Sequence, residues 1–148
     1  MWQTLKAWIG RWRRPGGTGR EADDAGAEGE RLAAEFLRRE LGFKIIIRNW
    51  RSPRDLRDEL DLVCRDGEVL VLVEVKSRSA EALVPGYYAV NRRKKAALRR
   101  AGSAYLRALH PAPQHFRLDV VEIGTHEGRA PEIRHFANVE LFAKHWRP

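Results

Sequence analysis

The sequence predicts a single α/β domain in which helices flank a central mixed β-sheet. Its 148 residues are enough for one compact core with tails, and too few for two comfortable domains. Helix-like and strand-like hydrophobic patterns follow one another as helix, three strands, helix and strand, which favours a mixed sheet. The chain is 43% hydrophobic and 32% charged, and no apolar run approaches the length that crosses a bilayer.

The predicted elements follow from periodicity and from residues that end helices or form turns. A first helix is expected from Glu28, with apolar side chains at helical spacing and Gly42 as its stop. A run with three isoleucines then predicts a strand at residues 43–50. Strand-like residues 60–64 and 69–75 flank an Asp-Gly pair, which is a strong hairpin signal. The remaining elements are a helix at 92–109, a strand at 116–123 and a short last helix at 139–146.

The first 25 residues are predicted to form a basic amphipathic segment and a linker, ahead of a domain at residues 26–148. If residues 2–14 are helical, their tryptophans and aliphatic side chains lie within an arc of roughly 120°. The Pro-Gly-Gly-Thr-Gly run at residues 15–19 is typical of a flexible linker. Residues 1–14 could bind the protein's own domain or a partner protein, lie on an anionic membrane, or follow a nucleic acid. The sequence leaves these uses open.

Charge and cysteine content restrict the class of protein further. The net charge is +8, and five positive charges with no acid fall in the first twenty residues: Lys6, Arg11, Arg13, Arg14 and Arg20. Such basicity is compatible with a polyanionic partner. Cys64 is the only cysteine, which excludes an internal disulfide and a thiolate zinc cluster. No secretory signal is recognisable, so a cytoplasmic location is expected.

Charged side chains gather on one face of the predicted hairpin. With Asp66-Gly67 as the two-residue turn, Asp61 faces Leu72 and Glu59 faces Glu74. Because side chains alternate along a strand, one face carries four charged residues: Glu59, Asp61, Glu74 and Lys76. Asp61 and Glu74 become diagonal neighbours roughly 7–8 Å apart at the backbone, so their carboxylates can converge on one ion.

This cluster predicts a divalent-metal site. Three carboxylates and one ammonium leave about two negative charges uncompensated, which is costly away from water unless a cation binds. Ligation by oxygen alone, with no His or Cys nearby, points to Mg²⁺ or Mn²⁺ rather than zinc. The alternative is that these acids lie at the exposed end of an edge strand and pair with Lys76 and Arg78.

Two charged residues on the predicted helices lie where apolar residues are expected. Glu30 falls between Leu37 and Leu41 on the helical wheel, although a carboxylate in a first turn also suits the helix dipole. Lys94 is in line with Leu98 and Tyr105 on the later helix. Its amine could reach either solvent or a phosphate.

Several motifs together resemble the bacterial YraN-like family over residues 28–123. They are Gly29-Glu30, Arg48-Asn49-Trp50-Arg51, Glu59-Leu60-Asp61-Leu62-Val63, Val73-Glu74-Val75-Lys76-Ser77-Arg78 and Arg117-Leu118-Asp119-Val120-Val121. That family is similar to the restriction-endonuclease-like nucleases of the PD-(D/E)xK superfamily and to archaeal Holliday junction resolvases. The joint order of the motifs is far more specific than any one of them.

The resemblance implies a restriction-endonuclease-like fold and a set of site residues. Asp61, Glu74 and Lys76 match the catalytic aspartate, acid and lysine of the superfamily, and Glu30 matches the helix glutamate of the resolvase-like branch. Two positions depart from the pattern. Leu60 stands where the superfamily name has proline, and Asp58 stands where the family usually has glycine, after a longer loop.

The expected function is Mg²⁺- or Mn²⁺-dependent hydrolysis of phosphodiester bonds in DNA, including branched intermediates of recombination and repair. Asp61 and Glu74 would hold the metal, with Glu30 and Lys76 completing the catalytic set. Contacts to flanking phosphates are expected from Arg78, Arg93 and Lys94. Two alternatives are a non-catalytic nucleic-acid-binding protein and an adaptor tethered to a membrane or partner protein by residues 1–14. Substrate structure and homodimer formation stay open.

Overall fold

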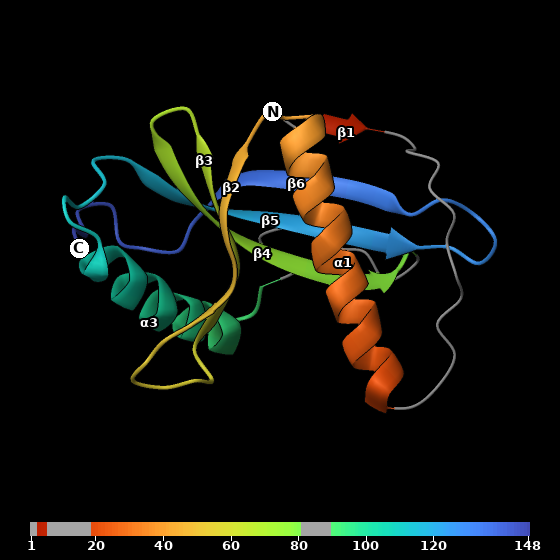
Figure 1. Ribbon diagram of the computed structural model, residues 1–148, viewed down its shortest axis with the longest axis horizontal. Helices are drawn as coiled ribbons and strands as arrows, with labels where there is room; N and C mark the ends of the chain where they lie inside the picture. The colour runs from red at the N-terminus through yellow and green to blue at the C-terminus, as the bar shows by residue number, and fades with distance from the viewer. Residues whose placement is uncertain (1–2, 6–18, 81–89) are drawn as a thin grey trace.

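The computed structural model describes residues 3–5, 19–80 and 90–148, with the backbone alone for 3–5 and 19–23. Figure 1 shows how its elements are arranged. The helices are α1 (Gly19–Arg39) and α3 (Arg92–Ala108), and the strands are β1 (Gln3–Leu5), β2 (Lys44–Arg51), β3 (Glu59–Asp66), β4 (Val69–Ser79), β5 (Phe116–Thr125) and β6 (Glu132–Val139). The predicted single α/β domain is confirmed.

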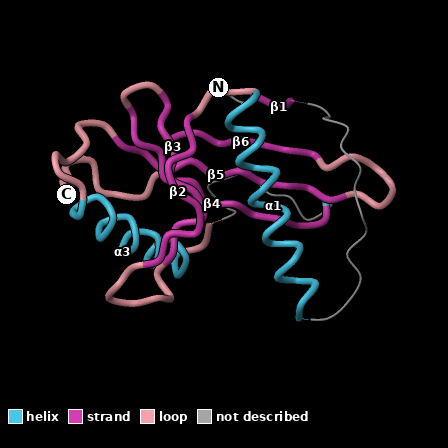
Figure 2. The backbone as a smooth tube through the Cα atoms, viewed as in Figure 1, coloured by secondary structure: helices cyan, strands magenta, loops and turns pink. Residues whose placement is uncertain are grey.

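The strands form one mixed sheet. Their order is β1-β6-β5-β4-β3-β2, with β4 parallel to β5 and every other neighbouring pair antiparallel. Parallel neighbours need a crossover, and α3 lies in the connection between β4 and β5. The tube view in Figure 2 shows β4 running away from β2 and β3 toward the side of the sheet that α1 crosses.

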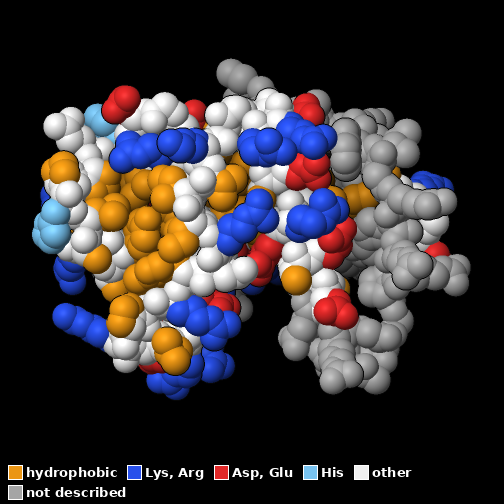
Figure 3. Space-filling model, viewed as in Figure 1, with side chains coloured by type: hydrophobic (Ala, Val, Ile, Leu, Met, Phe, Trp, Pro, Cys, Tyr) orange, Lys and Arg blue, Asp and Glu red, His pale blue; other side chains and the backbone are white. Residues whose placement is uncertain are grey.

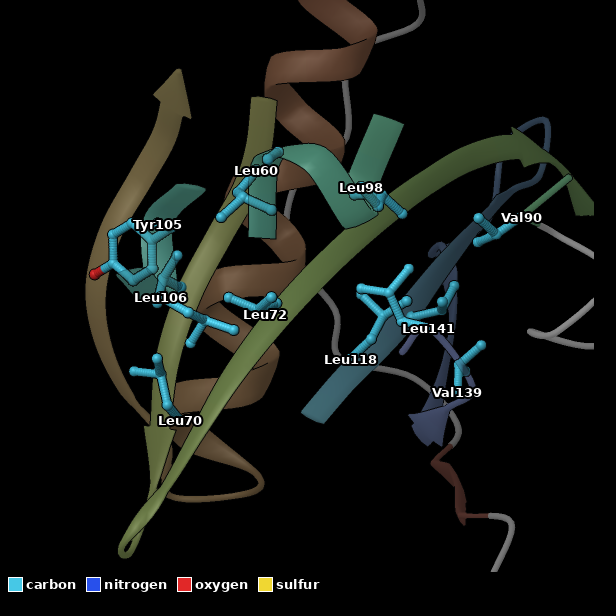
Figure 4. Packing of buried hydrophobic residues seen from close by; sticks show 13 residues of the cluster. Leu60, Leu70, Leu72, Val90, Leu98, Tyr105, Leu106, Leu118, Val139 and Leu141 are labelled. Atoms are coloured by element: carbon cyan, nitrogen blue, oxygen red, sulfur yellow. The ribbon is translucent and has the colours of Figure 1, made fainter. Parts of the chain in front are cut away.

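A separate hydrophobic core lies on each face of the sheet. On one face, residues of α1 such as Phe36 and Leu37 pack with Val71 and Val73 of β4. On the other face the core combines α3 with the opposite side of the sheet, as Figure 4 shows: Leu60, Leu70, Leu72, Leu98, Tyr105, Leu106 and Leu118. The two helices therefore cover opposite faces, with the charged row of β4 on the α3 side.

Helix α1 is longer than predicted, because it begins at Gly19 rather than near Glu28. The added turns contain alanines, which favour a helix, and acidic residues, which suit its N-terminal end. Residues 19–25 are thus helical and not linker. The predicted stop is confirmed, since Gly42 has a positive φ of 72° and the Phe43 amide donates to the Leu37 carbonyl.

The β3–β4 hairpin has a different register from the one predicted. Asp66 pairs with Val69, so Gly67 and Glu68 form the turn. Gly67 adopts a φ of +57°, which glycine tolerates at the first central position of a type II′ turn. The pairing is shifted by two residues, and an even shift leaves the paired side chains of residues 62–66 and 69–73 on their predicted faces.

The last part of the chain was predicted wrongly. Residues 132–139 form β6, and the short helix expected at 139–146 does not exist. Phe142 and Trp146 have the spacing of one helix face, but their rings stack on each other outside any helix, with centroids 4.2 Å apart. Both rings also pack against Phe116. Strand β6 was missed because polar residues interrupt its alternation.

The N-terminal prediction is tested at three residues only. Gln3–Leu5 pair with β6 as an edge strand, so a helix through these residues is wrong. The other residues of the amphipathic segment, and residues 15–18 of the linker, lie outside the described part of the chain. Within the described ranges, neither helix has the length and apolar character to span a membrane.

Candidate active site

The site lies where β3 and β4 separate. Their ladder ends at Leu62 paired with Val73, and the Asp61 carboxylate then takes the place of a strand partner. Its Oδ2 accepts a hydrogen bond of 2.8 Å from the Val75 amide. If the observed register continued, Asp61 would pair directly with Glu74, whereas the predicted register made the two residues diagonal neighbours. Because β3 and β4 part at this point, the Asp61 side chain can lie beside the charged residues of β4.

Glu74 is the centre of the cluster. Its side chain is 1% exposed, and Oε1 lies 2.9 Å from the Lys76 ammonium and 3.3 Å from that of Lys94. The second oxygen, Oε2, is buried without a hydrogen-bond partner. A buried carboxylate oxygen without a donor is costly, so Glu74 has capacity for a further electropositive group.

Asp61 is destabilised as an anion in this position. Burial, and then the neighbouring Glu74 carboxylate, raise the pKa of Asp61 to about 7 from an ordinary 3.8. Smaller effects come from the Val75 amide and Lys94, which lower this pKa, and from Glu30, which raises it. The pKa of Asp61 is therefore influenced by charges on both faces of the sheet, because Glu30 belongs to α1 and Lys94 to α3.

Local structure fixes both helices against the site. The Asn91 side chain caps α3 by accepting from the Lys94 amide at 2.9 Å, which holds Lys94 in the first turn. On α1, a Cβ at Gly29 would overlap the hydroxyl of Ser77 on β4. Glycine is therefore needed there for the helix to approach the strand closely, and this approach carries Glu30 to the cluster.

The carboxylate oxygens of Asp61 and Glu74 suit a hard cation that keeps part of its water shell. Glu74 Oε2 is buried without a donor, and Asp61 Oδ1 is the oxygen of that carboxylate that does not accept from the Val75 amide. Mg²⁺ is commonly bound by one or two carboxylates and substrate phosphates. No group of three His, Cys, Asp or Glu residues forms a ready-made metal site within the described ranges. The residues fit a cation shared with a ligand rather than an all-protein cage.

The structure also places the remaining predicted residues. Lys94 points to Glu74 and not to open solvent, and its pKa is raised because Glu74 and Asp61 outweigh the effect of burial. Arg93 is exposed on α3, and Arg78 lies two residues beyond Lys76 on β4. In Figure 3, basic and acidic side chains intermingle over α1, whereas a broad hydrophobic area covers the left of the same face.

Asp58, the residue that departs from the family pattern, does not enter the cluster. Arg100 of α3 donates to both of its carboxylate oxygens, at 3.0 and 2.8 Å. The Asp58 carbonyl closes the loop by accepting from the Ser52 amide at 2.9 Å. This acid therefore ties the long loop to α3 and leaves the carboxylates of the site unchanged.

Sequence reasoning missed two buried acids. Glu122 of β5 is 1% exposed, and Asp119 is fully buried in a network with Arg117 and His135. The signal for Glu122 was available, because it follows Leu118 and Val120 at every second position on an apolar face. What could not be read was which strand lies beside β4.

Fold and site together define a mixed-sheet α/β domain with a buried carboxylate pair and two lysines at the point where two strands part. The chain belongs to the uncharacterised protein family UPF0102, which residues 29–123 match. A UPF0102 protein of Beutenbergia cavernae is 42% identical over 120 residues, covering 81% of this chain and 98% of the relative. Others from Kineococcus radiotolerans (38%; 81% and 96%) and Anaeromyxobacter dehalogenans (42%; 81% and 84%) are also similar. The family resemblance drawn from the motifs is thereby confirmed.

Proposed function

We propose that the chain is a divalent-metal-dependent nuclease that hydrolyses phosphodiester bonds in DNA, with branched recombination and repair intermediates as candidate substrates. The observation that carries this proposal is the cluster itself: two buried carboxylates, one with an unpartnered oxygen, beside two lysines whose side chains are about a quarter exposed, at 26% and 27%. The restriction-endonuclease-like resemblance of the motifs supports the same reaction.

Glu74 would hold the metal through Oε2, which has no donor, and Asp61 through Oδ1, the oxygen that does not accept from the Val75 amide. A bound Mg²⁺ or Mn²⁺ would supply Lewis acidity and lower the pKa of a water molecule. The chain's own residues then position the reactants. Asp61 is oriented by the Val75 amide, and Glu30 contributes negative charge from α1.

The two lysines would stabilise negative charge on the substrate. Both ammonium groups now neutralise Glu74, at 2.9 and 3.3 Å from the same oxygen. A cation on Glu74 would take over that neutralisation, and the lysines would become available to a phosphate. Lys94 at the first turn of α3 suits a non-bridging oxygen, while Lys76 on β4 suits the attacking water. Arg78 and Arg93 would contact flanking phosphates.

Asp61→Ala tests the assignment. With Mg²⁺ or Mn²⁺ present, the wild-type chain is expected to cut branched or single-stranded DNA, and the variant to lose at least about 100-fold in rate because a ligand is missing. Gel assays of strand cleavage measure the rate, and Mn²⁺ titration calorimetry measures binding.

Asp55→Ala is the matched control, because Asp55 is a half-buried acid of the adjacent loop that pairs with Arg57 and not with the cluster. It should keep both cleavage and Mn²⁺ binding. Equal cleavage by wild type and Asp61→Ala would overturn the assignment. DNA binding that survives a chelator, with no Mn²⁺ site in the wild type, would instead identify a non-catalytic binding protein.

A further inference from the structure

A second unpartnered carboxylate lies next to the candidate site. Glu122 is 1% exposed, and neither of its carboxylate oxygens has a hydrogen-bond partner. In the described part of the chain, the buried side-chain oxygens without partners belong to Glu122 and Glu74 alone. Burial raises the pKa of Glu122, although Arg134 and Arg78 oppose this rise. A carboxylate held in this way costs stability, so its position calls for a function.

The strands on either side place a cation level with Glu122. Lys76 of β4 is its register partner on one side, and Arg134 of β6 is its partner on the other. Each of these cations is bonded elsewhere: Lys76 to Glu74 at 2.9 Å, and Arg134 to Glu132 at 2.7 Å. Glu122 thus lies between two basic residues and receives a hydrogen bond from neither.

A metal ion on Glu74 would change this arrangement. The Lys76 ammonium lies 2.9 Å from Glu74 Oε1, and a divalent cation on the same carboxylate would repel it strongly at such a separation. Neighbouring strands of a sheet lie only about 4.8 Å apart, and a lysine side chain spans more than that distance. Among the described residues, Glu122 is an acceptor that is level with Lys76 on the next strand and has no partner of its own.

We propose that Glu122 is a positioning residue that receives the Lys76 ammonium when a divalent cation occupies Glu74. In the metal-free chain Lys76 neutralises Glu74, and in the loaded chain it is anchored on β5, beside the cation and directed toward the substrate. This inference rests on the proposed function, because it needs the cation site. Glu122 would thus hold the Lys76 ammonium close to the site after the metal has replaced it on Glu74.

A double-mutant cycle on cation affinity tests the proposal. Mn²⁺ binding is measured by calorimetry for the wild type, Glu122→Gln, Lys76→Met and the double variant. Glu122→Gln is expected to weaken Mn²⁺ binding about tenfold in the wild-type background, where Lys76 loses its second anchor. In the Lys76→Met background the same change should matter about twofold or less, because no ammonium remains to be moved.

Two further measurements separate positioning from other roles. Glu127→Gln removes an exposed negative charge just beyond the end of β5 and reports the general charge effect, so it should weaken Mn²⁺ binding far less than Glu122→Gln does. In metal-free buffer at pH 8, Glu122→Gln should raise the unfolding temperature, because an unpaired buried carboxylate is removed. A purely structural carboxylate would give the opposite shift.

The outcomes are distinct. Equal effects of Glu122→Gln in both Lys76 backgrounds, or no effect in either, would overturn the proposal and leave the nuclease function standing. A lower unfolding temperature for metal-free Glu122→Gln would also overturn it. A wild-type chain that binds no divalent cation would overturn the proposed function, and the role of Glu122 with it.

Discussion

The position of Asp61, buried beside Glu74, lowers the stability of the metal-free chain at neutral pH. Its folded pKa is about 7, above the ordinary 3.8, because of burial and then the Glu74 charge. Because the pKa of Asp61 is higher in the folded chain than in the unfolded chain, the folded state is favoured most at low pH. This contribution to the free energy of unfolding is lost as the pH rises from about 4 to about 7. The charged form at neutral pH is therefore the strained one, and a bound cation would relieve it.

We expect Asp61→Asn to stabilise the metal-free chain near pH 8, by on the order of 3 kcal/mol, and to have little effect near pH 4.5. Urea unfolding in EDTA at the two pH values measures the difference. Asp55→Asn should show no such pH-dependent gain, since the hydrogen bonds from Arg57 lower the pKa of Asp55 rather than raise it. If Asp61→Asn were instead destabilising at pH 8, its bond to the Val75 amide would outweigh the cost of burial.

Periodicity predicted most of the site residues, because each breaks an apolar pattern. Glu30 and Lys94 interrupt helical faces, and Glu74 interrupts a strand. Which partners they meet was beyond the sequence. Lys94 reaches Glu74 only because α3 packs on the face of the sheet that carries Glu74, and Glu122 lies level with Lys76 only because β4 and β5 are parallel neighbours. Such long-range contacts leave no local pattern.

For most helices and strands, local sequence signals predicted the type of element better than its first and last residues. The Asp-Gly pair marked the hairpin correctly, but the turn uses Gly67-Glu68, because glycine supplies the positive φ at the first central position. Helix α1 extends by several residues into a segment interpreted as linker. Strand β6 was missed because its pairing to β5, and not its own composition, makes it a strand.

Contact between α1 and β4 depends on the missing side chain of Gly29. Gly29→Ala is expected to lower the free energy of unfolding by about 1 kcal/mol, because the Ser77 hydroxyl must rotate away and the helix must shift slightly from the Ser77 Cβ, which would lie 3.2 Å from the new methyl group. The same shift should weaken Mn²⁺ binding by moving Glu30. Thermal unfolding and calorimetry measure the two effects.

Gly26→Ala on the same helix is the control, since a Cβ there meets nothing within 4 Å. It should stabilise the chain by about 0.5–1 kcal/mol, the usual gain of alanine over glycine in a helix. Identical effects of the two substitutions would show that close approach at Gly29 does not hold the helix in place.

For the whole molecule, the charge distribution determines how a polyanion is attracted. Four of the basic residues precede the linker, and replacing Lys6, Arg11, Arg13 and Arg14 with glutamine would lower the net charge from +8 to +4 (8 minus 4). If these residues bind phosphates, DNA affinity should fall and its salt dependence should become less steep. The slope should change by up to about 0.9 for each phosphate that is no longer neutralised.

Binding of labelled duplex between about 50 and 200 mM salt measures this slope, and such a range is wide enough to resolve the neutralisation of one or two phosphates. Cleavage under saturating DNA should be unchanged, since the cluster at Glu74 is separate in sequence from these residues. An unaltered slope would show that the basic segment serves a membrane or a protein partner instead.

The bond between the Asp61 carboxylate and the Val75 amide has a practical consequence. That amide belongs to the strand that carries Glu74 and Lys76, and its hydrogen bond ends on a candidate metal ligand. A change in the electron density of the Asp61 carboxylate would therefore be felt at one backbone proton. The Val75 resonance in a ¹⁵N-labelled sample would report the arrival of a diamagnetic ion such as Mg²⁺ without a substrate and without turnover.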